Sequence, residues 1–137
     1  MLSVPRYGWV HFTIDDFTFC ASYLTDVPQD FIDALVAHFK YNISTTVELD
    51  GESDGNCTIL FNAYHDTVSA IHHVPEFDDR VETVFWDNNI LSIAQEFVRD
   101  VEENMEAWEN WGYDDEPKKI DLTELKAILA EKTMVAQ

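Results

Sequence analysis

Apolar residues recur with a period of two in some stretches of this sequence and at three- and four-residue steps in others. A period of two places alternate side chains on one face of a β-strand, whereas steps of three and four place them on one face of an α-helix. The sequence therefore predicts a fold built from both strands and helices.

Strand-like periodicity occupies the first residues and the middle of the chain. Residues 8–14 and 17–23 alternate on either side of the polar break Asp15-Asp16, which predicts a β-hairpin. Further strand-like runs cover residues 45–50, 56–64, 67–74 and, as a candidate, 81–86. The turn signals Asp50-Gly51 and Asp54-Gly55 indicate that the first two of these runs form another hairpin.

Helical periodicity marks residues 28–40, 89–111 and 122–132. Together with the strands, these helices predict an α+β fold: a mostly antiparallel sheet of five or six strands with helices packed on it. The length of 137 residues is that of one domain, so we expect residues 1–137 to fold as a unit.

The charge of the chain restricts its partners. The sequence holds 27 acidic side chains against eight lysines and arginines, for a net charge of -19. Long-range repulsion makes direct binding to nucleic acid or to an anionic membrane unfavourable, whereas a basic protein is attracted. The sequence shows no membrane-spanning run and no signal peptide, so we expect a cytoplasmic protein.

The acidic residues are concentrated in residues 76–116, which carry 14 acidic and two basic side chains. On the predicted long helix, like charges at four-residue spacing and acids near the C-terminus both oppose helix stability. A one-signed face that lowers stability favours a binding role over a merely solvated surface.

Trp108 and Trp111 lie among these acids, and aromatic side chains anchor many interfaces, although they also cover the ends of sheets. The predicted partner-binding residues at the centre of the face are Glu96, Asp100, Glu103, Glu106, Trp108, Glu109 and Trp111. Weaker candidates are Asp78, Asp79, Asp114, Asp115 and Glu116.

No motif of the sequence indicates catalysis, a cofactor or a metal. Residues 50–55 resemble the first half of a calcium loop, but the twelfth position holds Phe61 instead of the required glutamate. Cys20 and Cys57 lie in strand-like runs without metal-type spacing, so we expect buried, reduced thiols. We therefore expect a protein that is not an enzyme.

Residues 17–35, FTFCASYLTDVPQDFIDAL, resemble bacterial immunity proteins of contact-dependent growth inhibition and polymorphic toxin systems. Small acidic proteins of those systems often begin with such a hairpin leading into a helix. The resemblance implies a partner, the toxin domain of a large secreted effector, which is commonly a basic nuclease.

We therefore predict an immunity protein that binds a cognate basic toxin domain through an acidic surface and occludes its active site. A phage-type DNA mimic that inhibits a restriction or CRISPR enzyme is the alternative, and an enzyme of unknown class is the third. A mimic spreads its charge, whereas residues 117–137 carry three acids and four bases, which favours one local acidic face.

Overall fold

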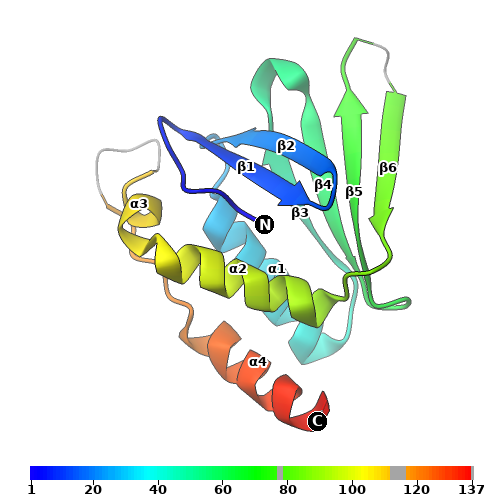
Figure 1. The fold of residues 1–137 in the computed structure, drawn as a ribbon, viewed down its shortest axis with the longest axis vertical. Helices are drawn as coiled ribbons and strands as arrows, with labels where there is room; N and C mark the ends of the chain where they lie inside the picture. The colour runs from blue at the N-terminus through cyan, green and yellow to red at the C-terminus, as the bar shows by residue number, and fades with distance from the viewer. Residues whose placement is uncertain (77–78, 112–116, 137) are drawn as a thin grey trace.

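The computed structural model describes residues 1–76, 79–111 and 117–136. Six strands are assigned: β1 (Trp9–Ile14), β2 (Phe17–Ser22), β3 (Thr45–Asp50), β4 (Asn56–Asn62), β5 (Thr67–Val74) and β6 (Asp79–Phe85). The helices are α1 (Val27–Tyr41), α2 (Ile90–Glu103), α3 (Met105–Glu109) and α4 (Thr123–Ala136), with one 3₁₀ turn, η1 (Glu52–Asp54), between β3 and β4. The α+β class predicted from the sequence is confirmed (Figure 1).

The strands form two antiparallel sheets and not one. β1 pairs with β2, while β3, β4, β5 and β6 form a four-stranded sheet in chain order. The prediction of a single sheet of five or six strands is wrong because the β1–β2 hairpin packs its side chains on the larger sheet instead of pairing with its edge. Phe17 and Phe19 of β2 meet Phe85 and His72 edge-on, with ring centroids 5.8 and 5.2 Å apart.

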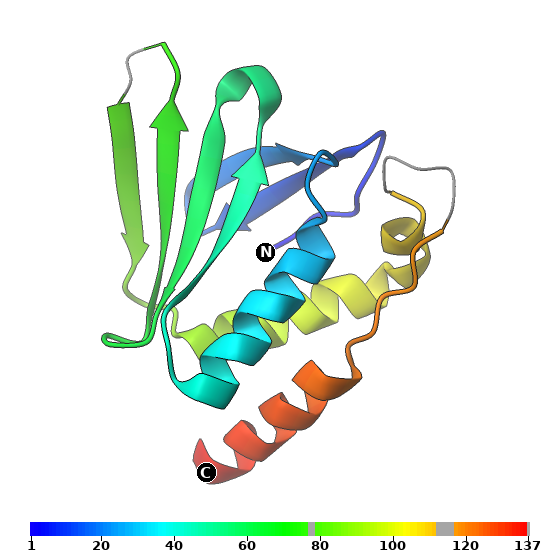
Figure 2. The ribbon, with the colours of Figure 1, turned by 180° about the vertical axis from the view of Figure 1, so that it is seen from behind.

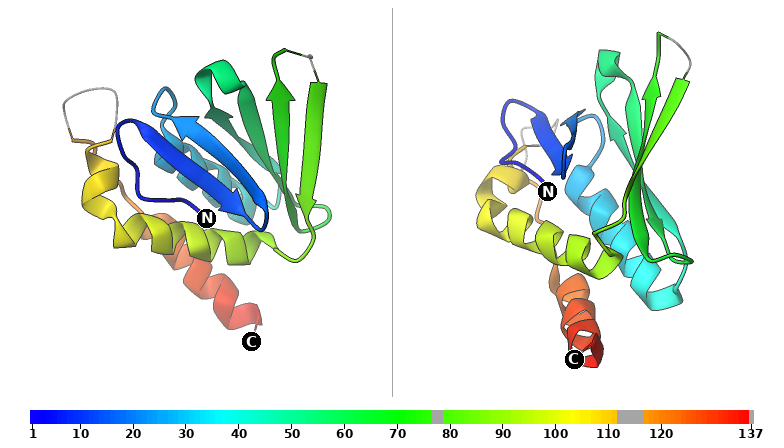
Figure 3. Two further views of the ribbon diagram at one scale, coloured as in Figure 1. Left: turned by 45° about the horizontal axis from the view of Figure 1, so that its top comes forward. Right: turned by 45° about the vertical axis from the view of Figure 1, so that its right-hand side comes forward.

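The core lies between the four-stranded sheet, the hairpin and the helices. Phe31 of α1 is at its centre, with ring centroids 6.2 Å from Phe12 of the hairpin, 6.1 Å from Phe61 of β4 and 5.2 Å from Phe97 of α2. Hairpin and helices all lie on the same side of the four-stranded sheet, and none of the described helices or strands covers its other face (Figure 3). The predicted packing of helices on one face of a sheet is therefore correct.

Local signals in the sequence set the ends of the first helices. Asp26 caps α1 by accepting a hydrogen bond from the backbone N–H of Gln29 at 3.4 Å, and Asn42 ends it in the left-handed region at φ 53°. Asn89 caps α2 through the N–H of Ser92 at 2.8 Å. These boundaries lie within one residue of those predicted.

The long helix expected over residues 89–111 is broken at Asn104, which corrects the sequence prediction. The N–H of Asn104 bonds to the carbonyl of Val101 three residues back, and its side-chain amide bonds to the carbonyl of Asp100 at 3.2 Å. This tighter turn ends α2 and starts α3 in a new direction, because asparagine side chains compete for backbone hydrogen bonds.

The segment 50–55 forms the predicted hairpin loop between β3 and β4, closed by the pairing of Asp50 with Asn56. Asp50 accepts a hydrogen bond from the N–H of Glu52 at 2.7 Å. Gly55 has φ 85°, and a Cβ at this position would collide with the carbonyl oxygen of His73. Only glycine fits there, so the second Asp-Gly signal has a steric cause.

α4 packs on α1 and α2. Leu125 and Leu129 of α4 are buried, as is Leu122, the residue just before the helix. Figure 2 shows α4 below α1, at the end of the chain. Ion pairs tie α4 to both neighbours: Lys40–Glu124 at 3.2 Å and Lys126–Glu102 at 2.8 Å. α4 begins one residue after the predicted position and extends four residues further.

Candidate partner-binding surface

Asp100 is buried, with 8% of its surface exposed, so its prediction as an exposed residue of the binding face is wrong. Its Oδ2 atom accepts a hydrogen bond from the N–H of Leu2 at 2.9 Å and lies 3.1 Å from the amino group of Met1. The N-terminal segment covers this flank of α2, which the helical spacing alone did not reveal. Asp100 holds two distant parts of the chain together.

Trp108 and Trp111 are also internal, contrary to their prediction as exposed anchors. Trp108 is 1% exposed, Trp111 is buried, and the two rings meet edge-on with centroids 5.1 Å apart. The break at Asn104 is the reason, because it turns α3 and carries these rings into the core. The alternative considered from the sequence, that they cover the end of the sheet, was right in expecting structural rather than exposed rings, and both rings belong to the hydrophobic core.

Four of the predicted acids remain at the surface of α2 and α3. Glu103 and Glu106 are exposed, and Glu96 and Glu109 are partly exposed. Asp79 is exposed too, but it begins β6 at the end of that strand far from α2 (Figure 1). Asp78, Asp114, Asp115 and Glu116 lie outside the described residues.

The turn between α2 and α3 forms a shallow depression of about 510 Å³, here called the acidic junction. Its lining residues are Glu103, Asn104, Met105, Glu106, Ala107 and Asn110. Among the ion pairs of the described residues, none involves Glu103 or Glu106. Neighbouring Glu102 differs, because it is paired with Lys126.

The electrostatics of the acidic junction are unfavourable in the free protein. Glu103 lies in the last turn of α2, where the helix dipole is negative, whereas Glu106 lies in the first turn of α3. The two carboxylates, placed on either side of one turn, also repel each other. A cationic side chain placed in the depression would relieve both terms, so this arrangement suits a basic ligand.

Sequence reasoning missed a group of exposed aromatic side chains, here called the aromatic end: Tyr41, Tyr64 and Trp86. Tyr64 is 89% exposed and Trp86 76% exposed. Their segments meet at the end of the four-stranded sheet where β4 and β6 finish and β5 begins (Figure 1). Trp86 is the last residue of the candidate strand 81–86, and its position just before Asp87-Asn88 was the available signal.

Exposed tyrosine and tryptophan side chains are uncommon on surfaces that contact only water, and they supply much of the energy at protein interfaces. Asp66 fixes the turn that carries Tyr64 by accepting a hydrogen bond from the N–H of Ile90 at 3.2 Å. The same contact joins this turn to the first residue of α2. The aromatic end is therefore positioned by the helix that leads to the acidic junction.

A cleft of about 480 Å³ between β2 and the four-stranded sheet contains Cys20, His11, His72 and Asp54 among its lining residues. Burial, with the nearby charge of Asp54 as the smaller cause, raises the pKa of the Cys20 thiol. His72 Nε2 lies 3.0 Å from the backbone oxygen of Asp54. The thiol is thus held in its protonated form, which is the opposite of an activated nucleophile.

The second cysteine is less reactive still. Cys57 is buried, and burial raises the pKa of its thiol to about 12. Both cysteines are free thiols, as expected, although Cys20 is only partly buried.

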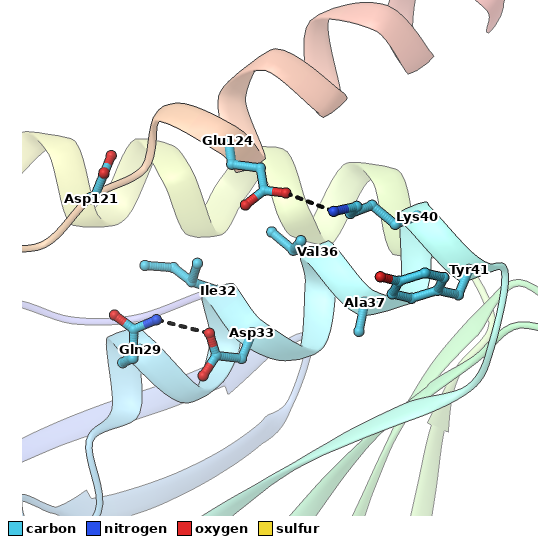
Figure 4. A pocket seen from close by; sticks show the side chains of 9 residues that line it. All are labelled: Gln29, Ile32, Asp33, Val36, Ala37, Lys40, Tyr41, Asp121 and Glu124. Atoms are coloured by element: carbon cyan, nitrogen blue, oxygen red, sulfur yellow. Dashed lines mark hydrogen bonds and ion pairs between the residues drawn. The ribbon is translucent and has the colours of Figure 1, made fainter.

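A groove of about 340 Å³ separates α1 from α4 (Figure 4). The Lys40–Glu124 ion pair bridges it, and Glu124 raises the pKa of Lys40. Gln29 donates a hydrogen bond to Asp33 at 2.8 Å along the same wall. Lys40 and Glu124, and likewise Gln29 and Asp33, are therefore engaged with each other across and along this groove.

In residues 1–76, 79–111 and 117–136, no three histidine, cysteine or acidic side chains are grouped so as to hold a metal ion. Within the same residues, no helix has the length and apolar character needed to cross a membrane.

Comparisons with known proteins do not assign this fold and surface to a group. No protein family, no curated protein and no solved structure matches the chain.

Proposed function

We propose that the protein is an immunity protein that binds and neutralises a cognate basic toxin domain, of the nuclease class, through the acidic junction. The observation that carries this proposal is the exposure of Glu103 and Glu106 without a cationic partner among the described residues, in a protein of net charge -19. The role is inhibition by binding in the cytoplasm and not catalysis.

The proposed mechanism is electrostatic steering followed by occlusion. A nuclease active site is lined by cationic groups that attract phosphates, and the carboxylates of the acidic junction would take the place of those phosphates. Opposite charges can raise association rates to about 10⁸–10⁹ M⁻¹s⁻¹ at low salt. Half-buried Met105 in the depression offers an adaptable apolar contact for the stem of a lysine or arginine.

The aromatic end is the proposed source of apolar anchoring, since Trp108 and Trp111 are internal. α2 starts four residues after Trp86 and has 14 residues, so it spans about 21 Å. A standard interface covers roughly 800 Å² of each partner. One partner of ordinary size can therefore reach from the aromatic end to the acidic junction along α2.

Charge reversal tests the acidic junction. The variant Glu103→Lys with Glu106→Lys should stay folded, because both side chains are exposed, and should lose protection of cells that express the candidate toxin domain. The matched control, Glu76→Lys with Glu131→Lys, alters two exposed acids elsewhere and changes the net charge equally.

Protection by the control together with loss in the junction variant supports the proposal. If both variants lose protection equally, the total charge matters and not the junction, as expected for a DNA mimic. If both protect fully while circular dichroism shows folded proteins, the acidic junction is not the binding surface.

A further inference from the structure

We propose that two copies of this protein associate through the free edge of β6, in an antiparallel pairing centred on Val81 that joins their four-stranded sheets. Figure 1 shows β6 at one side of the molecule and the turn between α2 and α3 at the other. The acidic junction of each copy therefore stays outside the pairing. The inference does not depend on the proposed toxin partner.

β6 is an edge that the rest of the described chain leaves open. Among the described residues, β5 is the only strand that pairs with it, and its one other backbone hydrogen bond is at its last residue, where Phe85 accepts from Asn88. Other edges are occupied: the N–H of Ser3 donates to the carbonyl of His11 in β1 at 3.0 Å, and β3 packs against α1. An edge strand presents N–H and C=O groups with which a further strand can pair.

The sequence of β6 lacks the features that most often prevent such pairing, which are lysine, proline, a β-bulge or a very short strand. Its seven residues, DRVETVF, include no lysine or proline. Its pairing with β5 runs without a bulge from Phe85 opposite Val68 to Asp79 opposite Val74. Val81 is 55% exposed within this strand. The edge of β6 is therefore a regular template for another strand.

The charged side chains of β6 determine which strand it can accept. Arg80 and Glu82 lie two residues apart, so both side chains are on the face opposite the buried Phe85, which is the open face of the sheet. Both are exposed, and among the described residues neither belongs to an ion pair. A suitable second strand therefore offers a carboxylate opposite Arg80 and a cation opposite Glu82.

A second copy of β6 meets this requirement when the pair is centred on Val81. Each Arg80 is then directly opposite Glu82 of the other copy, and the two Val81 side chains face each other. Registers centred on Arg80 or on Glu82 would place like charges opposite each other, which is destabilising. A register centred on Thr83 would leave Arg80 beyond the end of the other strand.

The net charge of -19 on each copy opposes this association at long range. Salt shortens the range of the repulsion to about 8 Å at 0.15 M, whereas the facing Arg80 and Glu82 side chains interact at contact distance. Pairing through one strand edge gives a small interface. We therefore expect a reversible dimer with a dissociation constant of about 10–100 μM.

Sedimentation velocity of the full chain at 0.15 M salt tests the proposal. The mass should rise from the 15.8 kDa of one chain at about 1 μM toward twice that value at about 500 μM. Val81→Lys should weaken the dimer at least about tenfold, because it places two positive charges opposite each other. The matched control, Val4→Lys, changes an exposed valine before β1 and should leave the dimer unchanged.

Exchange of the two charges tests the register itself. Arg80→Glu alone and Glu82→Arg alone each place like charges opposite each other, so each should weaken the dimer at least about tenfold. The double variant restores both opposite-charge pairs and keeps the net charge of the protein. It should therefore dimerise as the unmodified protein does. Circular dichroism shows whether each variant is folded.

Three results would overturn the proposal. They are a mass that stays at 15.8 kDa up to about 500 μM, equal effects of Val4→Lys and Val81→Lys, and a folded double variant that does not recover dimerisation. A fourth is a monomer whose β6 amides become protected from hydrogen exchange only when a basic toxin domain is added. That result would assign the edge to the toxin domain and not to a second copy.

Discussion

Asp100 and Glu103 lie three residues apart on α2, yet their side chains have opposite surroundings. Asp100 is buried against the N–H of Leu2, whereas Glu103 is exposed at the acidic junction. Asp100→Ala would leave a buried N–H without an acceptor, so it should lower the free energy of unfolding by about 1–3 kcal/mol. Glu103→Ala should change it by less than about 0.5 kcal/mol.

Urea denaturation of both variants measures the difference. Asp100→Asn is the intermediate case, because the amide oxygen can still accept from Leu2 but the negative charge is lost. A result in which Asp100→Ala is as stable as the unmodified protein would mean that the contact with Leu2 contributes nothing.

Cys57 is a second single residue with a measurable effect, because it makes the free energy of unfolding depend on pH. Burial raises its thiol pKa from 9.0 to about 12, so the folded state favours the protonated thiol. This contribution is fully present below pH 9, where the thiol of the unfolded chain is protonated too, and is lost as the pH rises toward 12. The stability advantage of the unmodified protein over Cys57→Ala should therefore shrink across this range.

Denaturant melts at several pH values between 8 and about 11 give the free energy of unfolding of the unmodified protein and of Cys57→Ala. The contributions of all other titrating groups cancel in the difference between the two values. A difference that stays constant with pH would show that the folded protein does not hold Cys57 protonated.

At the scale of elements, the packing of α4 on α2 gives Glu102 and Glu106 different surroundings, although helical spacing alone places both on the same flank. The sequence predicts that replacing Glu102 and Glu106 together by glutamine relieves like-charge repulsion and raises stability slightly. In the structure Glu102 pairs with Lys126 of α4 at 2.8 Å, whereas Glu106 is exposed on α3. Because the break at Asn104 places Glu106 in the first turn of α3, where an acid is favourable, we expect Glu106→Gln to change stability by less than about 0.5 kcal/mol.

Glu102→Gln should instead destabilise, by up to about 1 kcal/mol, since the pair is solvent-exposed and only modestly favourable. Thermal melts at low salt measure both changes. Stabilisation by both variants would indicate that the Glu102–Lys126 pair contributes nothing in solution.

For the whole molecule, the net charge of -19 has opposite effects on folding and on binding. Self-repulsion destabilises the compact free protein, and salt screens it as the Debye length falls from about 30 Å at 0.01 M to 8 Å at 0.15 M. The melting temperature should rise over this range, while the association rate with a basic toxin domain should fall. Calorimetry measures the melting temperature, and stopped-flow mixing measures the association rate. An association rate that does not change with salt would contradict electrostatic steering.

The sequence by itself determined the local features of this protein. Alternation predicted the β1–β2 hairpin, the helical periodicity beginning at Pro28 and Asn89 placed the starts of α1 and α2, and Asp-Gly signals placed the loop closed by Gly55. These features depend on neighbours within a few residues, so the sequence contains their causes. The concentration of acidic residues in 76–116 can likewise be read directly from the sequence.

Only the tertiary structure decided which side chains reach solvent. Helical spacing placed Asp100 beside Glu103, but the N-terminal segment, distant in sequence, covers one and not the other. The turn at Asn104 buries Trp108 and Trp111, while Trp86 stays exposed at the end of the sheet. Exposure is set by what packs against a residue from elsewhere in the chain, and periodicity describes only the residue's own helix or strand.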